Sequence, residues 1–171
     1  MQKKDILIKI QNLFYNRSFA QVSMNEIAIS LNIKKASLYY YFPSKEVLIS
    51  ELLDFSYEEY SDFLIKILEL KLPDFIQKFV YYPQKSKNIF SVINQNGYSE
   101  YKNSSELIQK RQKEVFEIIH MYLQKKYAMN KERSFLLLCL LEEIGKKRCI
   151  NGDCPLDMKN LIGEIQKIFI F

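Results

Sequence analysis

The chain has 171 residues, of which 48% are hydrophobic, and it contains only four glycines and four prolines. This composition predicts one or two compact domains, and the scarcity of Gly and Pro favours long helices over a turn-rich β fold. Three cysteines are too few, and odd in number, for a disulfide framework, so a reducing cytoplasm is expected. The longest apolar run, residues 135–141, is too short to span a bilayer, and the polar N-terminus shows no signal peptide.

The positive charge is concentrated near the N-terminus. Residues 1–48 carry seven Lys and Arg against three Asp and Glu, whereas the other residues carry 18 against 17. Most of the formal net charge of +5 therefore lies in the first third of the chain. An excess of this kind is typical of a surface that contacts phosphates.

The first three predicted helices are short. Apolar residues at helical spacing predict a helix over residues 3–16. Ser23 stands three residues before Glu26, which is the spacing of a capping box and predicts the start of a second helix. Asn32 lies in the turn that follows, where it tolerates a left-handed backbone. The third helix is expected over residues 34–42, with Leu38 and Phe42 facing the core.

The later helices are longer on average. Pro43 ends the third helix and Ser44 caps the fourth, which is expected to reach about residue 70. Pro83 is expected to separate two short helices, and Asn130 to cap a long one. The remaining predicted helices cover residues 74–81, 85–94, 103–126, 130–149 and 157–170. The expected fold class is all-α, with about nine helices.

Two motifs carry a family resemblance. They are Ser23-Met24-x-x-Ile27-Ala28 and Ser37-Leu38-Tyr39-Tyr40-Tyr41-Phe42-Pro43-Ser44-Lys45-Glu46-x-Leu48. With these motifs, residues 5–53 resemble the DNA-binding domain of the TetR (tetracycline-repressor) family of bacterial transcriptional regulators. The resemblance implies a three-helix helix-turn-helix domain over residues 1–48. It also implies a helical effector-binding and dimerisation domain over residues 49–171.

The chain departs from the family pattern at four positions. The family often has Gly where this chain has Ser18, Asn32 and Ala36, and a capping Ser or Thr where it has Lys34. The third helix therefore lacks a side-chain cap and gains a cation, so its half-site preference is expected to differ from that of its relatives.

The third helix is the predicted reading helix. Lys35 is suited to guanine, Ser37 to a base or phosphate, and Ala36 to a thymine methyl. The resemblance adds Asn25 as a base contact. The residues placed for phosphates are Ser23, Lys34, Tyr39, Tyr40 and Lys45. The alternative interpretation is that the lysines are merely solvated and that residues 39–42 form an aromatic core cluster.

In the resembled family, the last two helices pair with those of a second copy. The residues predicted for this homodimer interface are Phe135, Leu138, Leu141, Leu161, Ile165 and Ile168. An ordinary intramolecular core is the alternative.

Aromatic residues are numerous in the middle helices and suit an aromatic or lipophilic effector. The residues predicted to line its pocket are Phe63, Phe79, Phe90, Phe116 and His120. Aromatic residues at helical spacing are also typical of a core, and His120 suits a core or surface role as well. Cys139 is expected in the core, and Cys149 with Cys154 is a possible redox pair. A single histidine gives poor support to a metal site, and no cofactor is expected.

The sequence therefore predicts a cytoplasmic transcriptional regulator that binds a palindromic double-stranded operator as a homodimer. The resemblance implies a repressor that an unknown small-molecule effector releases. No membrane partner is expected. No Gly-rich phosphate loop, nucleophile elbow or HExxH motif supports an enzyme. The other alternative is a helical protein-interaction adaptor whose helix-turn-helix segment does not bind DNA.

Overall fold

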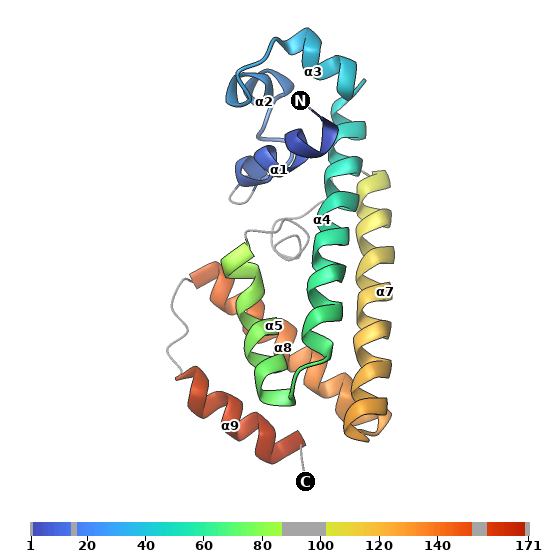
Figure 1. The fold of residues 1–171 in the computed structure, drawn as a ribbon, viewed down its shortest axis with the longest axis vertical. Coiled ribbons are helices and arrows are strands. Elements are labelled where there is room, and N and C mark those ends of the chain that lie inside the picture. The colour runs from blue at the N-terminus through green and yellow to red at the C-terminus, as the bar shows by residue number, and fades with distance from the viewer. Residues whose placement is uncertain (1, 15–16, 87–101, 152–156, 170–171) are drawn as a thin grey trace. The chain divides into compact units, whose positions relative to one another are not determined.

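The computed structural model describes residues 2–14, 17–86, 102–151 and 157–169, and all secondary structure in these ranges is helical (Figure 1). The helices are α1 (Lys3–Phe14), α2 (Met24–Ser30), α3 (Lys35–Tyr41), α4 (Lys45–Leu68), α5 (Leu72–Ser86), α7 (Lys102–Tyr127), α8 (Lys131–Asn151) and α9 (Met158–Phe169). The predicted all-α class is confirmed.

The chain divides into two compact units. The first runs to Tyr60 and includes the start of α7 through Gln109, and the second comprises Ser61–Ser86 and the chain from Lys110 onward. Helix α4 thus contributes residues to both units. The domain boundary predicted near residue 48 lies within the first unit and stays a prediction.

In the first unit, α1 is held against the first part of α4. Its apolar face is buried, and Phe14 meets Phe19 edge-on with ring centroids 5.2 Å apart. The polar contacts join Lys3 Nζ to Glu51 Oε1 at 2.7 Å and Gln11 Nε2 to Glu59 Oε2 at 3.0 Å. Phe19 therefore anchors the segment after α1, and α4 supports the helices that precede it.

The predicted start of α2 is confirmed. The Ser23 hydroxyl accepts from the backbone N–H of Glu26 at 3.1 Å, and the Glu26 carboxylate accepts from the backbone N–H of Ser23 at 3.1 Å. This reciprocal pair satisfies backbone donors that the first turn of a helix leaves unpaired. Asn32 has a φ of 54°, so the left-handed turn expected after α2 is also confirmed.

Helix α5 corrects the prediction that Pro83 is a break. The helix continues through Pro83 to Ser86, although proline removes a backbone donor. Phe75, Ile76 and Val80, which precede the proline, are almost fully buried and hold the earlier turns of α5. The helix predicted over residues 85–94 overlaps the end of α5 and otherwise lies outside the described residues.

In the second unit, α5 packs against both α8 and α9 (Figure 1). Asn130 caps α8 as predicted, since its Oδ1 accepts from the backbone N–H of Arg133 at 2.8 Å. The Arg133 guanidinium also donates to the Ile168 carbonyl at 3.1 Å, which ties α8 to α9.

Two further observations concern the chain as a whole. Within the described ranges, no helix is both long and apolar enough to cross a membrane. Cys139 is exposed, so its predicted core position is wrong, because it lies on the face of α8 opposite the buried Leu137 and Leu138. The side chain of Cys149 and the whole of Cys154 lie outside the described part of the chain.

Candidate nucleic-acid interface and ligand pocket

Two fully buried side chains attach helix α3 to the core. Leu38 and Phe42 are both 0% exposed, as their i, i+4 spacing predicts. Phe42 ends the helix in an extended conformation, with φ −132° and ψ 99°, because the following Pro43 disfavours helical geometry. The support fixes which face of α3 turns outward.

The outward face of α3 is basic and aromatic. Lys34, Lys35, Ala36 and Ser37 are exposed, and no acidic residue occurs between Lys34 and Lys45. Lys35 Nζ lies 5.8 Å from the centroid of the Tyr39 ring, which places the ammonium beside an aromatic face. Tyr39 is 40% exposed. A helix with this surface can enter a major groove and contact both base edges and phosphates.

The tyrosine run after Leu38 is not a core cluster. Tyr40 is 85% exposed and meets Tyr41 edge-on, with ring centroids 5.6 Å apart. Tyr41 is half-buried, and only Phe42 is fully buried. The run therefore passes from the surface into the core within four residues.

Lys34 is the N-cap residue of α3 and makes no side-chain capping bond, as its residue type predicts. The backbone N–H groups in the first turn of α3 therefore donate no hydrogen bond to the side chain of the N-cap residue. Lys45, at the first position of α4, is half-buried beside Ser44, whose hydroxyl accepts from the Val47 N–H at 3.2 Å. A hydrogen bond from Ser44 also lowers the pKa of Glu46.

The start of α2 completes the interface. Ser23 and Asn25 are both exposed there, so each of the nine residues predicted to contact DNA is at least partly accessible. Arg17 braces this turn, because its guanidinium donates to Glu26 Oε1 at 2.8 Å and to the Gln21 carbonyl. The Arg17 hydrogen bond, followed by that from the Ser23 backbone, lowers the pKa of Glu26.

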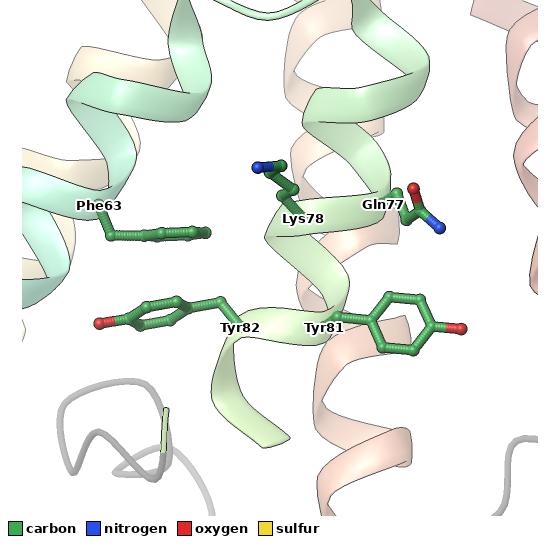
Figure 2. A pocket seen from close by; sticks show the side chains of 5 residues that line it. All are labelled: Phe63, Gln77, Lys78, Tyr81 and Tyr82. Atoms are coloured by element: carbon green, nitrogen blue, oxygen red, sulfur yellow. The ribbon is translucent and has the colours of Figure 1, made fainter. Parts of the chain in front are cut away.

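The structure separates the residues predicted to line an effector pocket. Phe63 of α4 lines a hollow of about 540 Å³ together with Gln77, Lys78, Tyr81 and Tyr82 of α5 (Figure 2). The pocket prediction did not include these four α5 residues, although three of them lie in the helix expected over residues 74–81. The signal was present in their i, i+1, i+4, i+5 spacing, opposite the apolar stripe.

The other predicted pocket residues lie elsewhere. Phe79 is buried against Phe75, with ring centroids 5.7 Å apart. Phe116 stacks on His120 at 5.8 Å and meets Phe135 edge-on at 5.5 Å. Phe90 lies outside the described residues. An effector role for these four residues stays a prediction.

His120 is held by a fully buried serine. Its Nδ1 lies 2.9 Å from the Ser134 Oγ, which also contacts the carbonyls of Asn130 and Lys131. This geometry fits an imidazole that links α7 to α8. In the described ranges, no three His, Cys, Asp or Glu side chains group as a metal site requires.

The residues predicted for a dimer interface are of two kinds. Leu138, Leu141 and Ile165 are buried within one chain, whereas Phe135 and Ile168 are 49% and 60% exposed. Leu161 is half-buried. Exposed apolar side chains that the prediction did not include are Leu136 and Leu140 on α8.

The fold and the exposed face of α3 define a helix-turn-helix protein with a helical second unit. Residues 6–52 match the family described as bacterial regulatory proteins, tetR family. Residues 6–52 therefore carry the N-terminal helix-turn-helix segment that this family model describes. The chain is also 37% identical over 49 residues to the HTH-type transcriptional regulator EthR of Mycolicibacterium smegmatis. That match covers 29% of this chain and 23% of the relative, so the chain spans about a quarter of its length.

Solved structures resemble the chain over nearly its whole length. A TetR transcriptional regulator from Legionella pneumophila has a TM-score of 0.68 and 21% identity, and the match covers 99% of this chain and 98% of that one. AibR in complex with isovaleryl coenzyme A and operator DNA has a TM-score of 0.70 and 18% identity, with coverage of 98% and 97%. At these identities the likeness shows the fold.

Proposed function

We propose that the chain is a DNA-binding transcriptional regulator, a repressor that leaves a palindromic operator when a small molecule binds. The observation that carries the proposal is the basic, aromatic outer face of α3, held outward by the buried Leu38 and Phe42. The match of residues 6–52 to the tetR family supports it. Such a protein acts in the cytoplasm and is not an enzyme.

In this proposal, Lys35, Ala36 and Ser37 face base edges together with Asn25 of α2. Short side chains at Ala36 and Ser37 let the backbone approach the groove, and Lys35 can donate to guanine O6 and N7. Ser23, Lys34, Tyr39, Tyr40 and Lys45 contact phosphates and fix the register.

A single helix-turn-helix reads few base pairs, so the proposed regulator binds as a homodimer on a near-palindrome. The solved relative AibR is described with both operator DNA and isovaleryl coenzyme A, which supports a partnership of DNA and a small organic molecule. Helix α4 carries residues of both units and contributes Phe63 to the hollow. Its orientation is therefore the proposed link between an effector and the half-site spacing.

Selection of bound fragments from genomic DNA tests the proposal. The expected result is a set of fragments that share a near-palindrome, bound with an affinity that falls by about 10³-fold or more between roughly 50 and 200 mM salt. Weak binding without a shared sequence and without salt dependence would instead support the adaptor that binds only proteins.

A further inference from the structure

The outer face of α5 carries an unusual combination of side chains. Figure 2 shows Phe63 of α4 lying over the Tyr82 ring, Lys78 on the same side of α5, and Gln77 and Tyr81 projecting on its other side. All five residues border the hollow of about 540 Å³. That volume lies within the range of about 300–1,000 Å³ that is typical of small-molecule sites.

The Phe63 and Tyr82 rings form one flat wall of the hollow. Their centroids are 3.8 Å apart and their planes differ by 18°, so the rings are stacked nearly parallel. Both side chains are half-buried, which leaves part of the pair open. A planar group can extend such a stack, and aromatic pairs contribute about 0.5–1.5 kcal/mol beyond burial alone.

The charge of the hollow is positive. Lys78 is exposed and forms no ion pair with any residue that the structure describes, and the exposed Gln77 amide has no hydrogen bond there either. Among the described residues that line this hollow there is no Asp or Glu. A molecule bound on the Phe63 side of α5 would therefore meet the Lys78 ammonium without a competing carboxylate from the described lining residues.

A second hollow, between α5 and α9, has a lining of mixed charge. It measures about 570 Å³, shares Gln77 and Tyr81 with the first, and is bordered by the carboxylates Asp74 and Asp157 and by the Lys159 ammonium. Because two carboxylates outnumber one ammonium there, an anion is less favoured in this second hollow than beside Lys78. The contrast gives the ligand a direction across the face of the helix.

We propose that the Phe63–Lys78 hollow binds an organic anion that carries a flat aromatic group. The ring lies against the Phe63–Tyr82 pair, and the anionic group pairs with the Lys78 ammonium. This inference rests on the proposed function, since it names the chemical class of the effector.

Calorimetric titration with 2-naphthoate and its uncharged isostere 2-naphthamide tests the inference. Each probe is titrated into the whole chain, into Lys78→Met and Phe63→Leu, and into Lys110→Met, which removes an equivalent exposed cation from α7. Thermal melting establishes that each variant is folded.

Naphthoate is expected to bind the parent chain about tenfold more tightly than naphthamide, in line with one charge-assisted hydrogen bond. Lys78→Met should abolish this preference, Phe63→Leu should weaken both probes by a similar factor, and Lys110→Met should change neither affinity. Absence of naphthoate binding at millimolar concentration overturns the inference. So does a preference for the anion that survives in Lys78→Met or disappears equally in Lys110→Met.

DNA binding, measured without either probe, separates this result from the proposed function. Salt-dependent binding to the selected fragment together with no binding of naphthoate overturns only the ligand class. Binding of naphthoate together with no binding to DNA overturns the regulator and leaves the hollow as a binding site for aromatic anions.

Discussion

Among the residues that the structure describes, two that are not glycine adopt the left-handed backbone conformation. Asn32 has φ 54° and Ala128 has φ 51°. The first was predictable, because an Asn side chain can stabilise that conformation through local hydrogen bonds. The second was not, since Ala carries no such signal. Ala128 directly follows α7, at the position where helices commonly end on Gly.

Ala128→Gly is expected to raise the free energy of unfolding by about 0.5–1 kcal/mol. Glycine removes the strain of the methyl group in the left-handed region, which exceeds the entropy that glycine adds to the unfolded chain. Urea titration measures the difference, with Asn32→Gly as the matched substitution expected to change stability by less. A loss of stability in Ala128→Gly would show that the turn after α7 does not need this conformation.

Glu26 makes the turn before α2 sensitive to acid. The Arg17 hydrogen bond lowers its pKa below the ordinary value of 4.5, so the folded state favours the ionised carboxylate. The resulting stability is present above pH 4.5 and is lost as the pH falls through the lower, folded pKa.

Glu26→Gln tests this linkage, because glutamine keeps the capping geometry but not the charge. The parent chain should be the more stable of the two at neutral pH. The difference in unfolding free energy should disappear as the pH is lowered through the acid range, as followed by urea titration at successive pH values. A difference that stays constant into strong acid would contradict a role for the charge.

At the scale of elements, side chains at the end of α7 cap the C-terminal end of α4. Lys126 Nζ donates to the carbonyls of Leu68 and Leu70 at 2.6 and 3.0 Å, and the Tyr127 hydroxyl donates to the Leu70 carbonyl at 2.9 Å. A cation at this end also complements the helix dipole. Hydrogen bonding to Tyr122 raises the pKa of Lys126, and burial raises that of Tyr127.

Tyr127→Phe is expected to lower the free energy of unfolding by about 1 kcal/mol, because it removes one hydrogen bond and leaves the Leu70 carbonyl with one partner fewer. Tyr40→Phe is the control, since the Tyr40 ring is exposed and its substitution should leave stability unchanged. Equal free energies of unfolding for the two variants, measured by denaturant titration, would contradict a stabilising contact at the end of α4.

The comparison of these elements shows which features are predictable from sequence. The caps at Ser23, Ser44 and Asn130 depend on neighbours within three residues, and each was predicted. The closure of α4 by Lys126 joins residues more than fifty positions apart, and no local pattern indicates it. The continuation of α5 past Pro83 is likewise not indicated by a local pattern, since proline removes a backbone donor and commonly ends a helix.

The same distinction applies to the sites. The exposed face of α3 that is proposed to contact DNA lies within one short segment, so the exposure of its residues could be predicted. The hollow beside Phe63 combines two helices, and only one of its five described lining residues was predicted. Cys139 was misplaced for a related reason, because a wholly apolar run such as residues 135–141 does not indicate which of its faces is buried.

At the scale of the whole molecule, the exposed apolar side chains of the last two helices form the surface that is proposed to contact a second copy. Phe135, Leu136 and Leu140 on α8 and Ile168 on α9 are all more than a third exposed. Leu138 and Ile165 already pack inside the chain. In the proposed homodimer, a second copy covers these exposed side chains. The buried Leu138 and Ile165 instead stabilise the fold of each protomer.

Leu136→Glu/Leu140→Glu is expected to convert a dimer into a folded monomer at micromolar concentration, because two buried charges without partners oppose association. Sedimentation velocity measures the change. Ile65→Glu places the same charge on an exposed apolar position of α4 and should leave the dimer intact. A parent chain that sediments as a monomer would contradict the homodimer itself.

The most direct measurement of the central claim is the affinity of Lys35→Ala/Tyr39→Ala for the selected genomic fragment at about 150 mM salt. Loss of the α3 contacts should weaken binding by at least about thirtyfold, whereas Lys9→Ala, which removes an exposed cation from α1, should change it far less. Undiminished affinity of the double variant would show that α3 does not read DNA.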